Sequence, residues 1–107
     1  MEKELGKITF AEYGTISDYP FLIGLQLGFE FGGSSVMDGG KHTVNIGKAC
    51  KWTEKERSVA VTETVERVYE ILKAAKVNYV SELIGKPVEV TLNDGWYVDF
   101  RILTEVL

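Results

Sequence analysis

The segment 21–31 (FLIGLQLGFEF) places an apolar residue at each of its six odd positions. Side chains of a strand alternate between the two faces of a sheet, so this spacing of two predicts a strand with one buried face. On the other face, Gly24 and Gly28 lack side chains, and glycine weakens a strand unless a bend or a close neighbour requires it. The segment therefore predicts a curved strand, and the rest of the chain must supply its partners.

Two shorter segments supply candidate partners for this strand. Segment 7–13 (KITFAEY) alternates, with Ile8 and Phe10 on one face, and segment 42–49 predicts a third strand. The intervening residues 32–41 include four glycines and two serines. This composition predicts a long flexible loop that closes a hairpin between the second and third strands.

The middle of the chain predicts one amphipathic helix. Thr53 and Glu56 have the spacing of a capping box, and no Gly or Pro occurs from there to Lys76. Apolar residues then recur at the helical spacing of three and four. This stripe, which we expect to pack on the sheet, consists of Val61, Val65, Val68, Leu72 and Ala75.

The last third of the chain predicts a hairpin. Asn78 is a candidate cap for a short second helix, which Gly85 would end. Segments 88–92 and 96–102 both alternate between apolar and polar residues, and the turn 93–95 (Asn-Asp-Gly) is a strong hairpin signal. A regular alternation places Trp96, Val98, Phe100 and Ile102 inward and leaves Tyr97, Asp99 and Arg101 on the opposite face.

These elements give the order β-β-β-α-β-β, with the short second helix before the last two strands. We predict an α+β fold in which an antiparallel sheet of about five strands packs on one amphipathic helix. The 107 residues suffice for a single domain, 1–107. Whether the two hairpins form one open sheet or a curled, barrel-like one is left open by the sequence.

Composition excludes several classes of function. The net charge of −4 and the pI near 5.0 argue against direct nucleic-acid binding, which relies on a basic surface. One Cys and one His form neither an internal disulfide nor a structural zinc site, so we expect no metal and no cofactor. The absence of a long apolar run or a signal-peptide core predicts a cytosolic protein without membrane contact.

The single Cys and the single His raise the question of catalysis. Cys50 and His42 are residue types that form a nucleophile and its base. The sequence shows neither a nucleophile turn nor a third group that would orient the base. We therefore expect no catalytic residues and no enzymatic activity, with Cys50 a structural residue.

The glycine-rich segment suggests a second kind of chemistry. Backbone N–H groups of such segments bind anions, but a phosphate loop must lead into a helix, and here a strand is predicted to follow. The alternatives are a plain hairpin connection, which is the commoner case, and a mobile loop that closes over a small anionic ligand. The second alternative assigns ligand contacts to Ser34, Ser35, Lys41 and His42.

A surface role is also predicted for the last strand. Tyr97 and Arg101 share its exposed face in the regular alternation, and both residue types contribute strongly at interfaces. We add them to the candidate ligand-binding residues. We further expect a homo-oligomer, because a long apolar strand 21–31 at a sheet edge would pair with a second copy.

The second half of the chain resembles a family of small, mostly uncharacterised proteins of tailed bacteriophages and prophages. The shared features are Trp52-Thr53-Glu54 at the helix start, the lysine-rich helix end 73–77, the strand segment 85–90 (GKPVEV) and the C-terminal segment 101–107 (RILTEVL). The first half matches more loosely, around Ile23-Gly24 and the glycine-rich segment. The resemblance carries no catalytic motif, so no functional residue is transferred.

The resemblance implies a phage accessory protein that acts in the cytoplasm of the bacterial host. The function we predict is a non-enzymatic binding protein that inhibits a bacterial anti-phage defence system. It would do so by sequestering a small, nucleotide-like anionic ligand or by blocking a host protein. The alternative is a structural or assembly protein of the phage particle that forms homo-oligomers.

Overall fold

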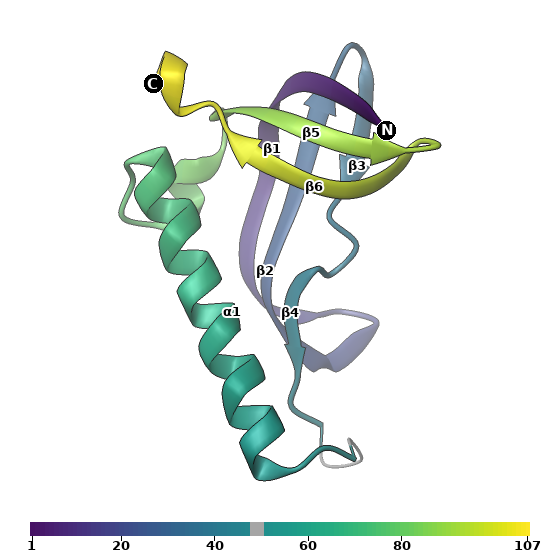
Figure 1. Ribbon diagram of the computed structural model, residues 1–107, viewed down its shortest axis with the longest axis vertical. Coiled ribbons are helices and arrows are strands. Elements are labelled where there is room, and N and C mark those ends of the chain that lie inside the picture. Colours follow the sequence, from purple (N-terminus) through teal and green to yellow (C-terminus); the bar gives the residue numbers. More distant parts are fainter. Residues whose placement is uncertain (48–50) are drawn as a thin grey trace.

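The computed structural model describes residues 1–47 and 51–107, which form an α+β fold with one antiparallel sheet and one long helix (Figure 1). The elements in chain order are β1 (Glu2–Ile16), β2 (Tyr19–Phe31), β3 (Ser34–Met37), β4 (His42–Asn45), α1 (Glu54–Ala75), the 3-10 helix η1 (Val80–Leu83), β5 (Pro87–Asn93), β6 (Trp96–Ile102) and the 3-10 helix η2 (Thr104–Val106). The predicted fold class is confirmed. No helix in the described ranges is long and apolar enough to span a membrane.

The sheet has the order β3-β2-β1-β5-β6, and β4 also pairs with β2. Strand β1 joins the two halves, since its first residues pair with β5 and the rest of it pairs with β2. In Figure 1, β5 and β6 run across the upper ends of β1 and β2. The ring of Tyr97 in β6 stacks on Phe29 in β2, with centroids 5.6 Å apart. The two hairpins therefore belong to one strongly curled sheet.

Strand β2 forms as predicted and supplies the centre of the core. Leu25, Leu27 and Phe29 are all fully buried. A Cβ on Gly24 would overlap the carbonyl oxygen of His42, and its φ of +154° favours glycine. This glycine thus permits the close approach of β4.

Strand β2 does not lie at a sheet edge. It has β1 on one side, and on the other side β3 pairs with residues 28–31 while β4 pairs with residues 22–25. The expectation that this strand is an open edge is therefore wrong, and self-association needs a different surface.

The segment 32–41 is not the long flexible loop that its composition predicts. Gly32 and Gly33 have φ angles of +52° and +82°, and they form a two-residue turn between the paired residues Phe31 and Ser34. Positive φ at both central residues is the requirement of a tight hairpin turn of type I′. The glycines therefore allow an additional strand, β3, where the composition indicates a loop.

Two β-bulges change which side chains face the core. In β1, Ile8 pairs with Phe29 and Phe10 with Gly28, so Thr9 is an extra residue. Ile8 is fully buried and Phe10 is 36% exposed, so the prediction that they share a face is wrong. An extra residue breaks the alternation of a strand, and everything beyond it changes face.

The second bulge lies in β6. Thr91 pairs with Asp99 and Leu92 with Tyr97, which leaves Val98 as the extra residue. Tyr97 is consequently on the core side, whereas Trp96 is 78% exposed. The predicted faces of these two aromatic residues are therefore reversed.

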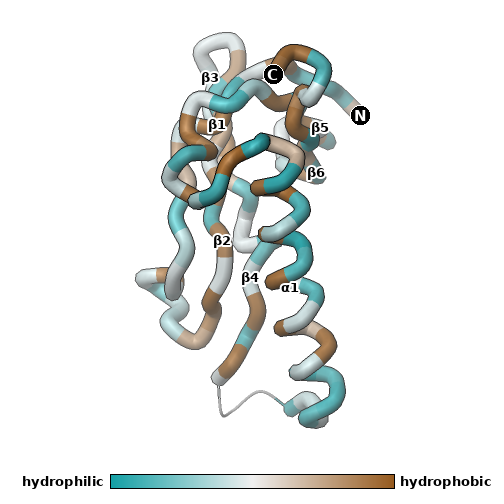
Figure 2. Tube along the Cα trace, turned by 90° about the vertical axis from the view of Figure 1, so that its left-hand side faces the viewer, coloured by the Kyte–Doolittle hydropathy of each residue, from teal (hydrophilic) through white to brown (hydrophobic). Residues whose placement is uncertain are grey.

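Helix α1 begins with the predicted capping box of Thr53 and Glu56 and ends at Lys76, whose φ is +58°. The predicted apolar stripe is buried only in its C-terminal part, where Ala75 is fully buried and Val68 and Leu72 are half-buried against the core. The fully buried residues of α1 are Ile71 and Ala75, while Val65 is 55% exposed. Figure 2 shows α1 running beside β4, and this short strand covers only one flank of the first helical turns.

The remaining predicted elements are also present. Leu83 of η1 is fully buried, and Gly85, with φ +89°, follows this helix. The cap of η1 is Tyr79 rather than Asn78, and the Tyr79 N–H donates to Glu82. The β5–β6 turn has positive φ at Asp94 and Gly95, as the hairpin prediction requires.

Candidate functional site

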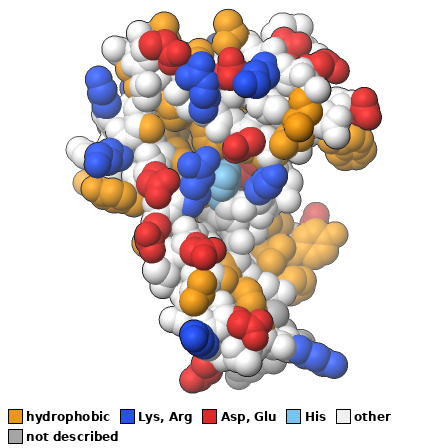
Figure 3. Space-filling view, viewed as in Figure 1, with side chains coloured by type: hydrophobic (Ala, Val, Ile, Leu, Met, Phe, Trp, Pro, Cys, Tyr) orange, Lys and Arg blue, Asp and Glu red, His pale blue; other side chains and the backbone are white. Residues whose placement is uncertain are grey.

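Polar side chains from α1, β4 and β6 meet near the middle of the molecule. We call Lys41, His42, Arg67, Tyr97 and Asp99 the His42 cluster. In Figure 3, the single histidine is flanked by basic side chains, with an acidic side chain next to it. The charges of Arg67, Asp99 and Lys41 all act on His42. The fold thus gathers residues that lie far apart in the sequence.

Aromatic rings form the floor of this cluster. Phe29 and Phe100 have ring centroids 5.0 Å apart, and His42 meets Phe100 edge to face at 5.9 Å. The Nζ atom of Lys41 lies 5.9 Å from the centre of the Tyr97 ring, and Cζ of Arg67 lies 5.8 Å from that of Phe100. Cations at this distance are attracted by the ring faces. The floor therefore holds two positive charges beside the histidine.

His42 is a buried histidine with a free ring nitrogen. His42 is 7% exposed, and its Nε2 atom has no hydrogen-bond partner among residues 1–47 and 51–107. Burial lowers the pKa of His42, the positive charges of Arg67 and Lys41 lower it further, and Asp99 acts in the opposite direction. The neutral imidazole is thus favoured. A neutral imidazole carries one donor and one acceptor, so Nε2 can donate or accept a hydrogen bond, depending on the tautomer.

Three buried side-chain polar atoms lack a partner in the described ranges: Nε2 of His42, Nε1 of Trp52, which lies outside the cluster, and the hydroxyl of Tyr97. Burial and the negative charges of Asp99 and Asp38 raise the pKa of Tyr97 well above its ordinary value. The phenol therefore keeps its proton, which can be donated to an acceptor atom of a ligand.

Of the two cations in the His42 cluster, Arg67 has the more unused hydrogen-bonding capacity. Its nearest carboxylate oxygens are Oδ1 of Asp99 at 3.9 Å and Oε2 of Glu70 at 4.0 Å, both too long for hydrogen bonds. Lys41, in contrast, donates from Nζ to the carbonyl oxygen of Val98 at 2.6 Å. A guanidinium carries five N–H donors in a planar fork that matches carboxylates and phosphates. Arg67 is therefore suited to bind an anion.

Asp38 has a structural role instead. This residue is 3% exposed, and its carboxylate accepts the N–H groups of Leu27 and Gly40, each at 3.2 Å. Its own N–H donates to the carbonyl of Leu27, and its carbonyl accepts from the N–H of Lys41. Burial raises the pKa of Asp38, and these backbone donors partly offset that effect. Asp38 bridges the place where the partner of β2 changes from β3 to β4.

The turn around Asp38 therefore offers less to an anion than its glycines suggest. The N–H groups of Gly40 and Lys41 both point to oxygen atoms of Asp38. An anion in this turn would have to compete with a carboxylate that is already in place. The anion-binding capacity lies in the neighbouring side chains rather than in the backbone.

The structure brings together three of the six predicted site residues. Lys41, His42 and Tyr97 all belong to the His42 cluster. Ser34 and Ser35 are exposed on β3, where they pair with Phe31 and Glu30.

Arg101 lies on β6 outside the cluster. It is held by Glu89 at 3.1 Å and by Glu105 at 3.2 Å, and these hydrogen bonds raise its pKa further. Its charge is thus balanced by two carboxylates. Cys50, the proposed nucleophile of the alternative weighed above, lies outside the described residues.

Arg67 and Asp99 were not predicted as site residues. Arg67 has the appearance of one member of a charge-balanced helix face, and Asp99 that of an ordinary polar strand position. The placement of Arg67 next to His42 depends on the rotation of α1 about its axis, which the sequence pattern does not give. The sequence signal that pointed to this part of the molecule was the adjacency of Lys41 and His42 in the chain.

A small cavity adjoins the cluster between α1 and β6. It has a volume of about 180 Å³ and is lined by Arg67, Glu70, Ile71, Ala74, Phe100, Arg101 and Ile102. Arg67 thus lines this cavity while also belonging to the cluster. In the part of the chain that the structure describes, no three His, Cys, Asp or Glu residues are grouped to hold a metal ion.

Comparisons with protein-family models, with curated proteins and with solved structures give no match to this chain. The resemblance to phage proteins therefore stays a prediction from the sequence. The function has to be inferred from the geometry of the cluster.

Proposed function

We propose that this protein binds a small anionic ligand at the His42 cluster and acts as a binding protein rather than as an enzyme. The ligand's anionic group would lie against Arg67, and its hydrogen-bonding atoms would meet Nε2 of His42 and the hydroxyl of Tyr97.

One observation carries this proposal. His42 is more than nine-tenths buried, its Nε2 has no partner in the described ranges, and it lies beside a guanidinium that makes no hydrogen bond there. A buried polar atom without a partner destabilises the folded state by about 1–3 kcal/mol. Such groups are expected where a ligand completes the hydrogen bonding.

The chemistry of the cluster narrows the class of ligand. A carboxylate or phosphate matches the fork of Arg67, and the two neutral groups discriminate by hydrogen bonding. A nucleotide-like anion, the small ligand that the sequence analysis predicts, carries such a phosphate together with further hydrogen-bonding groups on its base. A nucleotide-like anion is therefore the ligand class that we propose.

The biological setting of the proposal rests on the sequence resemblance described above. A phage accessory protein with this property would sequester a signalling nucleotide in the host cytoplasm and so inhibit a defence system that depends on it. The overall negative charge does not oppose this role, because binding would rely on local cations.

Calorimetric titration with AMP and with inorganic phosphate tests the proposal, together with native mass spectrometry of protein purified from a bacterial host. We expect AMP to bind, and Arg67→Gln to weaken binding by about tenfold or more, which corresponds to about 1.4 kcal/mol. Arg57→Gln is the matched control, since Arg57 lies on the same helix and donates to Ile46 instead.

Equal binding by both variants would place the ligand elsewhere on the molecule. No binding of either probe, combined with no co-purified small molecule, would contradict the proposal. A host protein that co-purifies in place of a small molecule would favour the alternative from the sequence analysis, in which this protein blocks a host protein.

A further inference from the structure

Helix α1 carries an exposed apolar stripe of Val61, Val65 and Tyr69, which shares only its first two residues with the predicted stripe and is covered by no other described element. Val61 is 37% exposed, Val65 is 55% exposed and Tyr69 is 64% exposed, although they recur at helical spacing along one flank. The flank that packs on the protein is a different one and includes Ile71 and Ala75. A contiguous exposed apolar surface of this kind is typical of an interaction site.

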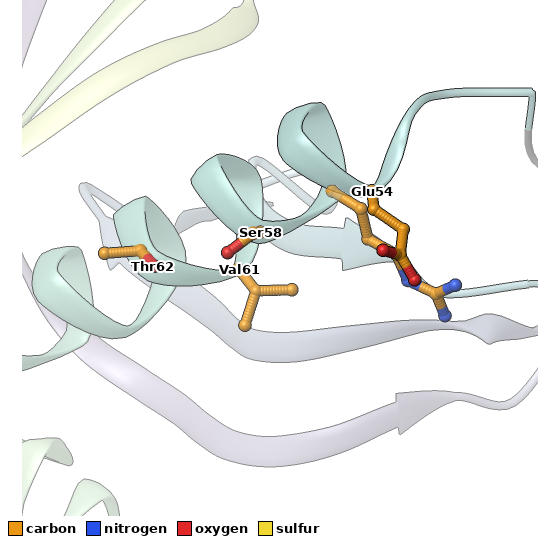
Figure 4. Close-up of a pocket in the computed structure, with 5 residues that line it drawn as sticks. Glu54, Ser58, Val61 and Thr62 are labelled. Carbon is orange, nitrogen blue, oxygen red and sulfur yellow. The ribbon is translucent and has the colours of Figure 1, made fainter.

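The stripe has charges of opposite sign at its two ends. Glu54 lies at its N-terminal end and Lys76 at its C-terminal end, and both are exposed. Between them, Ser58 leaves space for a larger side chain. Figure 4 shows how Glu54, Ser58, Val61 and Thr62 lie along α1. Together with Arg57, these residues line an open hollow of about 480 Å³.

We propose that a second copy of this chain packs on the stripe, with the two α1 helices antiparallel and a two-fold axis near Val65. This register sets Glu54 of each copy opposite Lys76 of the other. It also sets Tyr69, which is 64% exposed, opposite Val61 at the hollow of the other copy, and Val65 opposite itself. Apolar side chains from one helix pack into spaces on the other in this way in helical pairs.

Charge complementarity selects this arrangement. A parallel pair in register would bring the two Glu54 carboxylates together at one end and the two Lys76 ammonium groups together at the other. Like charges that face each other are unfavourable, and the helix dipoles would also be aligned in parallel. The antiparallel pair replaces both repulsions by attractions.

This inference is independent of the proposed ligand. Arg67 lies on a different flank of α1, where it faces Phe100, so the dimer leaves the His42 cluster accessible. Failure of either proposal therefore leaves the other intact.

Analytical ultracentrifugation of the full chain tests the dimer over about 1–200 µM, because dimerisation depends on protein concentration. We expect mass to rise above 12.0 kDa with concentration. Val65→Glu would place two carboxylates at the two-fold axis and weaken the dimer by about tenfold or more. Val59→Glu is the matched control, since Val59 is 48% exposed on the other side of the same helix.

A charge exchange tests the register. Glu54→Lys alone should weaken the dimer, and adding Lys76→Glu should restore it, which only the antiparallel pairing explains. Circular dichroism shows whether each variant is folded. A wild-type chain that stays at 12.0 kDa throughout, or a Val59→Glu variant that dissociates as readily as Val65→Glu, would overturn the proposal.

Discussion

The side chain of His42 combines burial, a free ring nitrogen and nearby positive charge. A histidine that only packed in the core would normally satisfy both ring nitrogens. Here Phe100 supports the ring, and Arg67 and Lys41 disfavour its protonated form. At the scale of single residues, this is the feature that distinguishes a site from an ordinary polar surface.

The first prediction follows from the lowered pKa of His42. The unfolded chain, with a pKa of 6.5, binds a proton more readily than the folded chain, so His42 stabilises the fold above that pH and this contribution is lost as the pH falls. We expect His42→Gln to flatten the dependence of the unfolding free energy between about pH 7.5 and 5.5. The effect of one group is at most about 1.4 kcal/mol per pH unit.

Urea unfolding of both proteins at several pH values provides the measurement. Asp38, whose pKa is raised, acts in the opposite sense, but it is present in both proteins and cancels in the comparison. Parallel pH profiles for wild type and His42→Gln would contradict the prediction.

The second prediction concerns the hydroxyl of Tyr97. Because this buried group has no partner in the described ranges, Tyr97→Phe removes an unsatisfied donor and keeps the stacking on Phe29. We expect the free energy of unfolding to stay unchanged or to rise by about 1 kcal/mol. Thermal unfolding measures this, with Tyr13→Phe, at a 50% exposed position, as the control. A clear loss of stability would mean that the hydroxyl is satisfied in the ligand-free protein.

At the scale of elements, the sequence predicted which strands exist better than which side chains they bury. A period of two assumes a regular ladder, and the extra residues Thr9 and Val98 break it. A bulge depends on how the strand pairs with its neighbour, so the local sequence pattern does not predict it. The helical spacing in α1 has the same limit. Val65 has the position of a core residue, but the short strand β4 does not cover it.

The third prediction compares two glycines that pair with each other in the neighbouring strands β1 and β2. Gly14 and Gly24 are directly paired, yet a Cβ on Gly14 meets nothing within 4 Å, whereas one on Gly24 overlaps the backbone of β4. We expect Gly24→Ala to destabilise the fold by about 2 kcal/mol or more through overlap and strain. Gly14→Ala should be neutral or slightly stabilising, because it only restricts the unfolded chain. Denaturant unfolding of the two variants measures this difference. Equal losses of unfolding free energy in both would contradict the close approach of β4.

For the whole molecule, β1 is the connection between the two halves of the sheet. Residues 2–7 pair with β5, and no other strand pairing in the described ranges links β5 and β6 to the rest. The fold class was predictable because the hairpins in each half of the chain have local sequence signals, namely alternating apolar residues and turn residues. The curling was not, because it depends on how one long strand is shared between two partners.

The fourth prediction tests this connection. Deletion of residues 1–6 removes most of the pairing with β5, so we expect a loss of cooperative unfolding and of the near-ultraviolet circular dichroism of the stacked Tyr97. The full-length chain should unfold in one transition. Deletion of Val106 and Leu107, which are 64% and 40% exposed, is the control and should leave both signals in place. A shortened chain that still unfolds in one sharp transition would show that the core alone holds the halves together.

The bulge in β6 has a consequence for how the length of this chain can vary. Removing Val98 would leave Asp99 and Tyr97 opposite their present partners, so the ladder would become regular without exchanging any face. The carbonyl that accepts from Lys41 would be lost, however, and the ammonium group would be released. A one-residue deletion at this position would thus preserve the architecture while altering the charge offered to a ligand. Position 98 is therefore a place where a change of chain length would alter the charge near the His42 cluster while keeping the strand register.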